Sequence, residues 1–274
     1  MKTPLRMGRI SFLNVLPIYY PLEADIIPHN FELVSGPPAL LNEMMAQGQL
    51  HASSCSCIEY ARHPERYYLV SDLSIGSKGP VMSVLLLSRK PIEELSGEEI
   101  LISGESHTSV ALLKLLLRER YNINASFRTG HVSNELRSSP PTAFLAIGDE
   151  ALRLRNHMDY PYLHDLAEEW RNWTGLPFIF GLWVISAAAV DSKMFQTDPG
   201  QILRDGRDWG LANMEIILDL TEKGCPLKRE ELRDYYNKGL FYTLGESEQK
   251  GLLAFYKLLH SAALINRIPE LRFY

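Results

Sequence analysis

The residues best suited to chemistry cluster where residues 100–117, ILISGESHTSVALLKLLL, change from a short apolar run to a leucine-rich helix. Three hydroxyl residues, Ser106, Thr108 and Ser109, stand at this junction. The first N–H groups of a helix have no partner inside the helix, and the helix dipole adds partial positive charge there. A carboxylate or phosphate is a suitable ligand at such a position. Ser106 alone could be a helix cap, but three hydroxyls favour a small anionic ligand.

Five further polar residues lie at predicted strand ends or loops, and each has two interpretations. Asn14 is either a helix cap or a ligand-binding amide. Ser83, inside an apolar run, is either satisfied by the backbone or directed into a cleft. Asp149 and Glu150 could serve as a general acid or base, or they could simply favour the start of a helix. His107 could be a neutral base at a helix N-terminus, or a residue that points to solvent.

Composition and motifs argue against several classes of function. The net charge of -5 and the absence of a basic run make nucleic acid an unexpected partner. The sequence has no nucleophile elbow, phosphate-binding loop or dinucleotide fingerprint, and no spacing typical of a metal helix. Cys55 and Cys57 form neither a disulfide framework nor a four-ligand zinc site, so we expect no metal and a reduced, cytoplasmic compartment. We expect neither an export signal nor a membrane span, since the longest nearly apolar run, residues 178–190, is too short to cross a bilayer.

The chain begins with an alternation of strands and helices. Strands are predicted at residues 7–12, 31–34 and 52–57, with a helix in each interval. This β-α-β-α-β spacing predicts parallel strands joined by right-handed crossovers. Asn14 precedes the first helix at the place of a cap, and Pro17 suits its first turn. The sequence is therefore predicted to fold as an α/β protein.

Two long buried strands, residues 81–88 and 178–186, bracket a second α/β unit. The spacing of Leu163, Leu166 and Trp170 predicts a helix over residues 162–173. Beyond Asp191 only helices are predicted; the last is amphipathic, with Thr243 and Glu246 as its capping box. We therefore expect two lobes: residues 1–86 with 183–274, and residues 87–182.

Loops at the carboxyl ends of the strands should open onto one cleft between these lobes. They comprise residues 11–16, 35–38, 53–58, 78–83, 104–109 and 147–150. A set of motifs in these loops and beyond them resembles the chorismate dehydratase family. In chain order the motifs are residues 8–14 (GRISFLN) with Pro17, Ser56 with Glu59-Tyr60, residues 79–84 (GPVMSV), residues 106–109 (SHTS), residues 147–152 (IGDEAL), Asp165-Leu166 with Trp170, and residues 174–178 (TGLPF) with Trp183. They cover about the first two-thirds of the chain.

The resemblance implies the two-lobed periplasmic-binding-protein-like type II fold, with the ligand between the lobes. It implies a lyase of the futalosine route to menaquinone, which removes water from chorismate to give 3-[(1-carboxyvinyl)oxy]benzoate without a cofactor. Asn14 and Ser83 would lie beside the reacting ring as catalytic residues. The substrate-binding residues would be Ser56, Ser106, Thr108, Ser109, Gly148 and Asp149.

Because protein bases are scarce in these loops, the enolpyruvyl carboxylate of the substrate is our hypothesis for the base, with Asp149 as the alternative. Other functions remain open at this point. The same fold is used by the 1,4-dihydroxy-6-naphthoate synthase of the same pathway. It is also used by solute-binding proteins that capture a small carboxylate, and by effector-binding domains of transcription factors.

Overall fold

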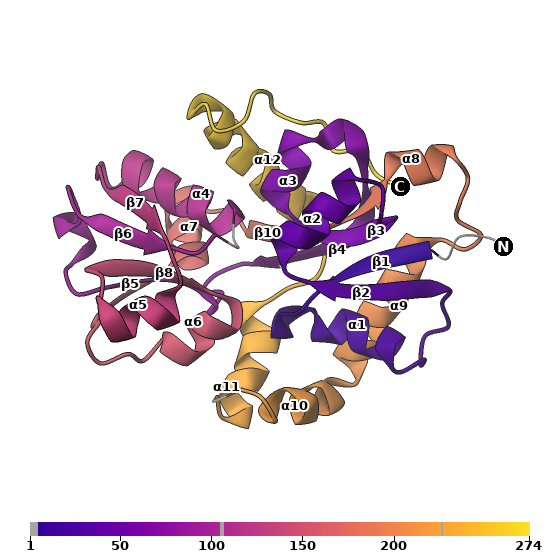
Figure 1. The fold of residues 1–274 in the computed structure, drawn as a ribbon, viewed down its shortest axis with the longest axis horizontal. Helices are drawn as coiled ribbons and strands as arrows, with labels where there is room; N and C mark the ends of the chain where they lie inside the picture. Colours follow the sequence, from indigo (N-terminus) through magenta and orange to yellow (C-terminus); the bar gives the residue numbers. More distant parts are fainter. Residues whose placement is uncertain (1–4, 105–106, 226) are drawn as a thin grey trace.

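The computed structural model describes residues 5–104, 107–225 and 227–274. Two five-stranded sheets lie side by side, each with helices around it (Figure 1). The first sheet, in spatial order, is β2 (Phe31–Gly36), β1 (Leu5–Ile10), β3 (Ala52–Ser56), β10 (Phe178–Ser186) and β4 (Tyr67–Ser77). The second is β7 (Ser126–Thr129), β6 (Glu99–Ile102), β8 (Ala143–Ile147), β5 (Val84–Ser88) and β9 (Tyr162–Asp165). We call the two sheets, with their helices, the first and the second lobe.

Both lobes contain the predicted parallel pairings. In the first lobe β1 pairs in parallel with both β2 and β3, through the crossover helices α1 (Leu16–Glu23) and α2 (Pro38–Ala46). In the second lobe β6 pairs in parallel with β7 and β8. The α/β prediction is therefore confirmed. The remaining helices are α3 (Cys57–Arg62), α4 (His107–Leu115), α5 (Val132–Ser138), α6 (Gly148–Leu154), α7 (Leu166–Thr174), α8 (Ala187–Asp191), α9 (Pro199–Ala212), α10 (Met214–Glu222), α11 (Arg229–Asp234) and α12 (Glu246–Ser261).

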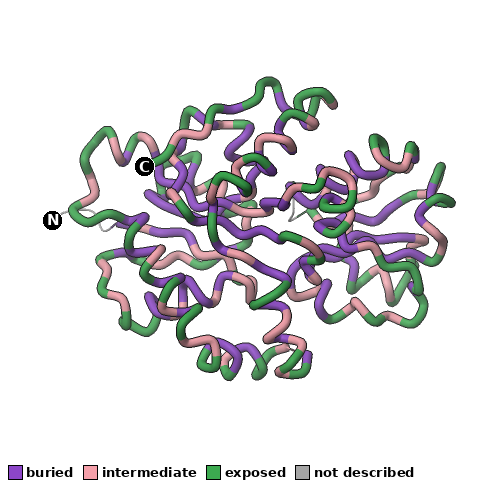
Figure 2. Tube along the Cα trace, turned by 180° about the vertical axis from the view of Figure 1, so that it is seen from behind, coloured by how far each residue is buried: buried purple, intermediate pink, exposed green. Residues whose placement is uncertain are grey.

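Central strands of both sheets are buried on both faces, while exposed segments concentrate in helices and loops (Figure 2). In β5, Val84 and Leu86 belong to the main apolar core, whereas Leu85 and Leu87 face a smaller core on the other side of the sheet. This is why β5 reads in sequence as a continuous apolar run without alternation.

The expected lobe boundaries, after residues 86 and 182, fall inside β5 and β10. Since β5 pairs only with strands of the second sheet and β10 only with strands of the first, the described chain crosses between the sheets before Val84 and again before Phe178. These crossings place residues 78–83 directly between the lobes.

The predictions for residues 162–173 and for the start of α12 are wrong in part. Residues 162–165 are the edge strand β9 rather than the start of a helix, because Asp165 accepts hydrogen bonds from the N–H groups of Ala167 and Glu168 and so caps α7. At α12 the cap is Gly245 and not Thr243, because the Glu248 carboxylate accepts the N–H of Gly245 at 2.9 Å.

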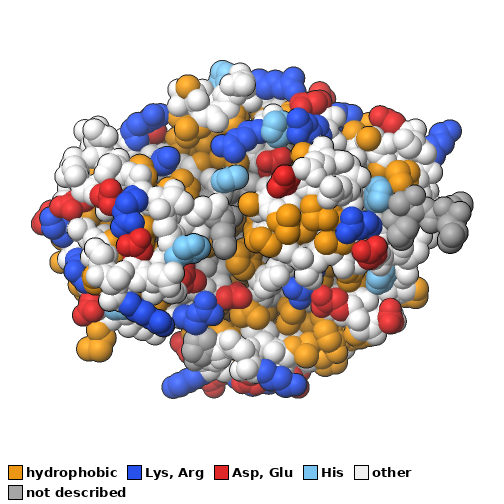
Figure 3. All heavy atoms as spheres, viewed as in Figure 1, with side chains coloured by type: hydrophobic (Ala, Val, Ile, Leu, Met, Phe, Trp, Pro, Cys, Tyr) orange, Lys and Arg blue, Asp and Glu red, His pale blue; other side chains and the backbone are white. Residues whose placement is uncertain are grey.

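On the surface, positive and negative side chains are interspersed over the face drawn in Figure 3. This is consistent with the small net charge of the chain. Within the described residues every helix is too short or too polar to cross a lipid bilayer.

Candidate active site

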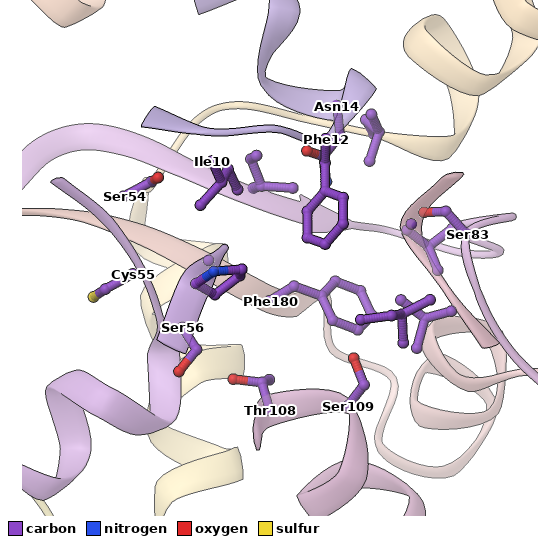
Figure 4. A pocket seen from close by; sticks show the side chains of 18 of the residues that line it. Ile10, Phe12, Asn14, Ser54, Cys55, Ser56, Ser83, Thr108, Ser109 and Phe180 are labelled. Carbon is purple, nitrogen blue, oxygen red and sulfur yellow. The ribbon is translucent and has the colours of Figure 1, made fainter. Parts of the chain in front are cut away.

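A cavity between the lobes brings together most of the predicted site residues (Figure 4). Six of them line it: Asn14, Ser56, Ser83, Thr108, Ser109 and Gly148. Figure 4 shows Phe12 pointing into the cavity from the side opposite Thr108 and Ser109. The loops that the sequence places at strand ends therefore do converge, with polar side chains on several sides of the cavity.

Aromatic and aliphatic side chains form most of the wall. Phe12 and Phe180 lie against the cavity, and Trp183 forms part of its lining. The Trp183 indole is held in place because its Nε1–H donates to the Tyr19 hydroxyl at 2.9 Å, and Tyr19 in turn donates to the Gly8 carbonyl at 2.8 Å. No Asp, Glu, His, Lys or Arg occurs among the described lining residues. Such a wall suits a flat carbon ring.

Asn14 lies in a short 3-10 turn, Leu13–Val15, just after β1. The interpretation of Asn14 as a helix cap is wrong, because α1 begins after Val15 and has no side-chain cap. The Asn14 side-chain Oδ1 is buried and has no hydrogen-bond partner in the described part of the chain. A buried polar atom without a partner costs about 1–3 kcal/mol, so a ligand that donates a hydrogen bond here would recover that free energy.

Ser83 lies on the segment that crosses between the lobes, one residue before β5 begins. The predicted strand over residues 81–88 starts late because Met82 has a φ of 65°, which a strand does not accommodate. The Met82 N–H donates to the Asp165 carboxylate at 2.6 Å, and the Ser83 carbonyl accepts the Gly148 N–H at 2.7 Å. These bonds hold the backbone from which the Ser83 side chain extends. Burial raises the pKa of Asp165 to about 6, against four backbone N–H groups that lower it.

The remaining hydroxyls of the predicted site, at α3 and α4, differ in their surroundings. Ser56 caps α3, since its Oγ accepts the Glu59 N–H at 3.3 Å. Thr108, in the first turn of α4, reaches across to the first lobe: its Oγ1 accepts the Ile58 N–H at 3.4 Å and lies 3.5 Å from Cys57 Sγ. Ser109 is buried in the same turn of α4. Thr108 therefore joins the lobes directly beside the cavity.

The remaining predicted residues lie elsewhere. Asp149 lines an adjacent, more polar cavity, where its Oδ1 accepts the Leu13 N–H at 3.2 Å and burial raises its pKa. Its place among residues that touch a ligand in the first cavity is thus not supported by the geometry. His107 is exposed and lines neither cavity, while Ser106 lies outside the described residues.

Three tyrosines that sequence reasoning missed hold this site from the C-terminal third of the chain. Tyr235 donates to Ser83 Oγ at 3.1 Å, Tyr236 to the Leu13 carbonyl at 2.9 Å, and Tyr242 to the Asn14 carbonyl at 2.9 Å. The available signal was the sequence of residues 235–242, YYNKGLFY, whose aromatic density is unusual for a surface helix end.

Two α/β lobes with a lined cavity between them define a protein with the periplasmic-binding-protein fold. Solved structures agree. A protein of Archaeoglobus fulgidus superposes with a TM-score of 0.73 at 18% identity, covering 95% of this chain and 98% of that chain. The periplasmic aliphatic sulphonate binding protein SsuA of Escherichia coli gives a TM-score of 0.68 at 13% identity, covering 98% and 91%.

Within that fold, the chain belongs to the menaquinone biosynthesis family, whose model matches residues 5–261. Two curated relatives are each named chorismate dehydratase. The one from Thermus thermophilus is 27% identical over 271 residues, covering 93% of this chain and 95% of the relative. The one from Campylobacter jejuni is 26% identical over 254 residues, covering 91% and 95%.

Proposed function

We propose that this protein is a chorismate dehydratase, which converts chorismate to 3-[(1-carboxyvinyl)oxy]benzoate on the futalosine route to menaquinone in the cytoplasm. The names of both curated relatives and the family membership support this activity. One observation in the structure supports it most directly. The buried, unpartnered Asn14 Oδ1 lines the same apolar cavity as Ser83, as expected for groups that bind a ring hydroxyl.

The reaction needs little covalent chemistry from the protein. The C3–H bond of chorismate breaks, its electron pair forms the new C3–C4 double bond, and the C4–O bond breaks with loss of hydroxide. The ring becomes aromatic, which supplies the driving force. A hydrogen bond donated by the Ser83 hydroxyl to the C4 oxygen would stabilise the charge that develops on the leaving group. Asn14 Oδ1 would accept the proton of the C4 hydroxyl and so hold the C4–O bond in the orientation that the elimination needs.

The C3 proton goes, in this proposal, to the enolpyruvyl carboxylate of the substrate itself. This fits a described lining without carboxylate, imidazole or amine. Cys55, which also lines the cavity, has a thiol pKa that burial raises well above its usual value, so it is a poor base. The proton and the hydroxide together account for the water that is lost.

The activity is tested by incubating the purified protein with chorismate and following the ultraviolet spectrum and the product mass. The expected product is an aromatic acid lighter than chorismate by one water. Turnover of cyclic dehypoxanthinyl futalosine instead would identify the naphthoate synthase activity. Binding of chorismate without any product would make the protein a carboxylate-binding protein and refute the proposal.

The identity of the base is tested with Asn14→Ala and Asp149→Asn. Loss of a group that orients the reacting bonds can lower the rate about 10²-fold, and we expect a loss of this size in kcat for Asn14→Ala. Asp149→Asn should keep most of kcat, since its carboxylate accepts a backbone N–H in the adjacent cavity. The opposite pattern, with Asp149→Asn inactive and Asn14→Ala changed only in KM, would show that Asp149 is the base.

A further inference from the structure

Tyr235 stands out among the buried hydroxyls because it contacts a side chain of the site rather than the backbone. It is fully buried at the end of α11, where the helix continues as the wider turn Tyr235–Gly239. Its hydroxyl lies 3.1 Å from Ser83 Oγ, although the two residues are 152 positions apart. Ser83 itself is only 3% exposed, so neither hydroxyl can rely on bulk water for a partner.

The direction of this hydrogen bond decides what Ser83 can do. A serine hydroxyl has one proton and two acceptor lone pairs, and a phenol is the more acidic and therefore the better donor of the two. Burial raises the pKa of Tyr235, so the phenol keeps its proton at neutral pH. Tyr235 is also the only hydrogen-bond partner of Ser83 Oγ among the described residues. With Tyr235 donating, one lone pair of Ser83 is occupied and its own proton is left for the cavity.

We propose that Tyr235 is a positioning residue, which directs the Ser83 hydroxyl proton into the cavity towards the hydroxyl that leaves the substrate. This inference rests on the proposed function. A Ser83 oxygen that already accepts a hydrogen bond is polarised, and its own O–H becomes a stronger donor. Tyr235 thus acts on the leaving group through Ser83 and does not touch the substrate.

The test compares Tyr235→Phe with Ser83→Ala, with the double variant and with a matched control. The control is Tyr160→Phe, at another buried tyrosine, whose hydroxyl donates to the Pro141 carbonyl at 2.8 Å in the second lobe and does not line the cavity. For each variant, kcat and KM with chorismate and the melting temperature are measured.

We expect Tyr235→Phe to lower kcat about tenfold, the factor expected for one hydrogen bond that matters in the transition state. KM should change less than about twofold, because the substrate does not contact Tyr235. In the Ser83→Ala background the same change should have no further effect on kcat. Tyr160→Phe should lower only the melting temperature.

A rescue experiment separates hydrogen-bond donation from packing. It also tests the positioning role if Tyr235→Phe folds poorly. Replacement of Tyr235 by 4-aminophenylalanine keeps a donor at the same place and should restore kcat.

Three results would overturn the positioning role. The first is a wild-type kcat in folded Tyr235→Phe. The second is that Tyr235→Phe lowers kcat by the same factor in the wild type and in the Ser83→Ala variant. The third is that 4-aminophenylalanine at position 235 fails to restore kcat. A wild-type protein that leaves chorismate unchanged would instead overturn the proposed function, and this inference with it.

Discussion

Gly148 is a position where one added methyl group tests the geometry of the site. It opens α6 with a φ of 54°, in the left-handed region that costs a non-glycine residue about 1–2 kcal/mol. For a chain of this length, that loss in the free energy of unfolding corresponds to a fall in the melting temperature of roughly 2–4 °C. Gly148→Ala is therefore expected to fold, with slightly reduced stability.

The added methyl group also meets the cavity wall. A Cβ at Gly148 would lie 3.1 Å from Phe12 Cδ1 and 3.2 Å from Cε1, so the ring must move by a few tenths of an ångström. Phe12 forms part of the apolar wall, and the Gly148 N–H holds the Ser83 carbonyl. A shift of the Phe12 ring or of the Gly148 backbone would therefore displace groups that orient the substrate. Small errors in orientation are costly, and we expect kcat/KM to fall about tenfold.

Gly175→Ala is the matched control. Gly175 ends α7 with a φ of 72°, but a Cβ there would meet nothing within 4 Å. Both variants should lose a similar amount of stability, measured by urea unfolding, while only Gly148→Ala should lose activity with chorismate. If kcat/KM of Gly148→Ala stays within about twofold of that of Gly175→Ala, the contact with Phe12 does not shape the site and the reasoning is wrong.

Two further predictions concern the lobe contact and the dependence of stability on pH. Thr108→Val removes the acceptor of the Ile58 N–H across the lobes; KM should rise about 3- to 10-fold with a smaller change in kcat, and an unchanged KM would contradict this role. Because the pKa of Asp165 in the folded protein is raised from 3.8 to about 6, its stabilising contribution is fully present below pH 3.8 and is lost as pH rises through about 6. Between about pH 4 and 6 the free energy of unfolding of the wild type should fall by about 2 kcal/mol relative to that of Asp165→Asn. Urea titrations in which the wild type instead becomes more stable relative to Asp165→Asn as pH rises would contradict this prediction.

Local sequence patterns were sufficient to predict the strands that are buried on both faces. The apolar run at residues 178–186 predicts β10 with its observed bounds, because burial on both faces leaves a continuous signal. Residues 162–165 show the opposite case. Leu163, Leu166 and Trp170 have helical spacing, yet Leu163 is 41% exposed in the edge strand β9. The spacing of Asp165 and Glu168 is that of a capping pair, and it would have indicated the correct start of α7.

The candidate site was predictable in part for a related reason. Asn14 follows β1, and Thr108 lies in the first turn of the helix that follows β6. Ser83 instead precedes β5, whose antiparallel pairing with β8 brings its start to the carboxyl end of β8. Their convergence therefore follows from topology once the strands are placed. Asp149 satisfies the same rule but lines the neighbouring cavity, because its carboxylate is occupied by the Leu13 N–H. Which side of a loop a residue faces depends on bonds of this kind, and no local pattern encodes them.

The role of the C-terminal third has a different explanation. Tyr236 and Tyr242 donate to backbone carbonyls of Leu13 and Asn14, and a carbonyl is present whatever side chain its residue has. Such contacts leave no matching residue type at the other end, so motifs at residues 13 and 14 carry no trace of their partners. Tyr236 also contacts a side chain, with its hydroxyl 3.1 Å from Thr221 Oγ1, but Thr221 lies outside the described cavity lining. Among the described residues, Tyr235 alone of the three donates to a side chain that lines the cavity, that of Ser83. It is therefore the one tyrosine of the three whose loss should change the chemistry of its partner and not only the partner's position.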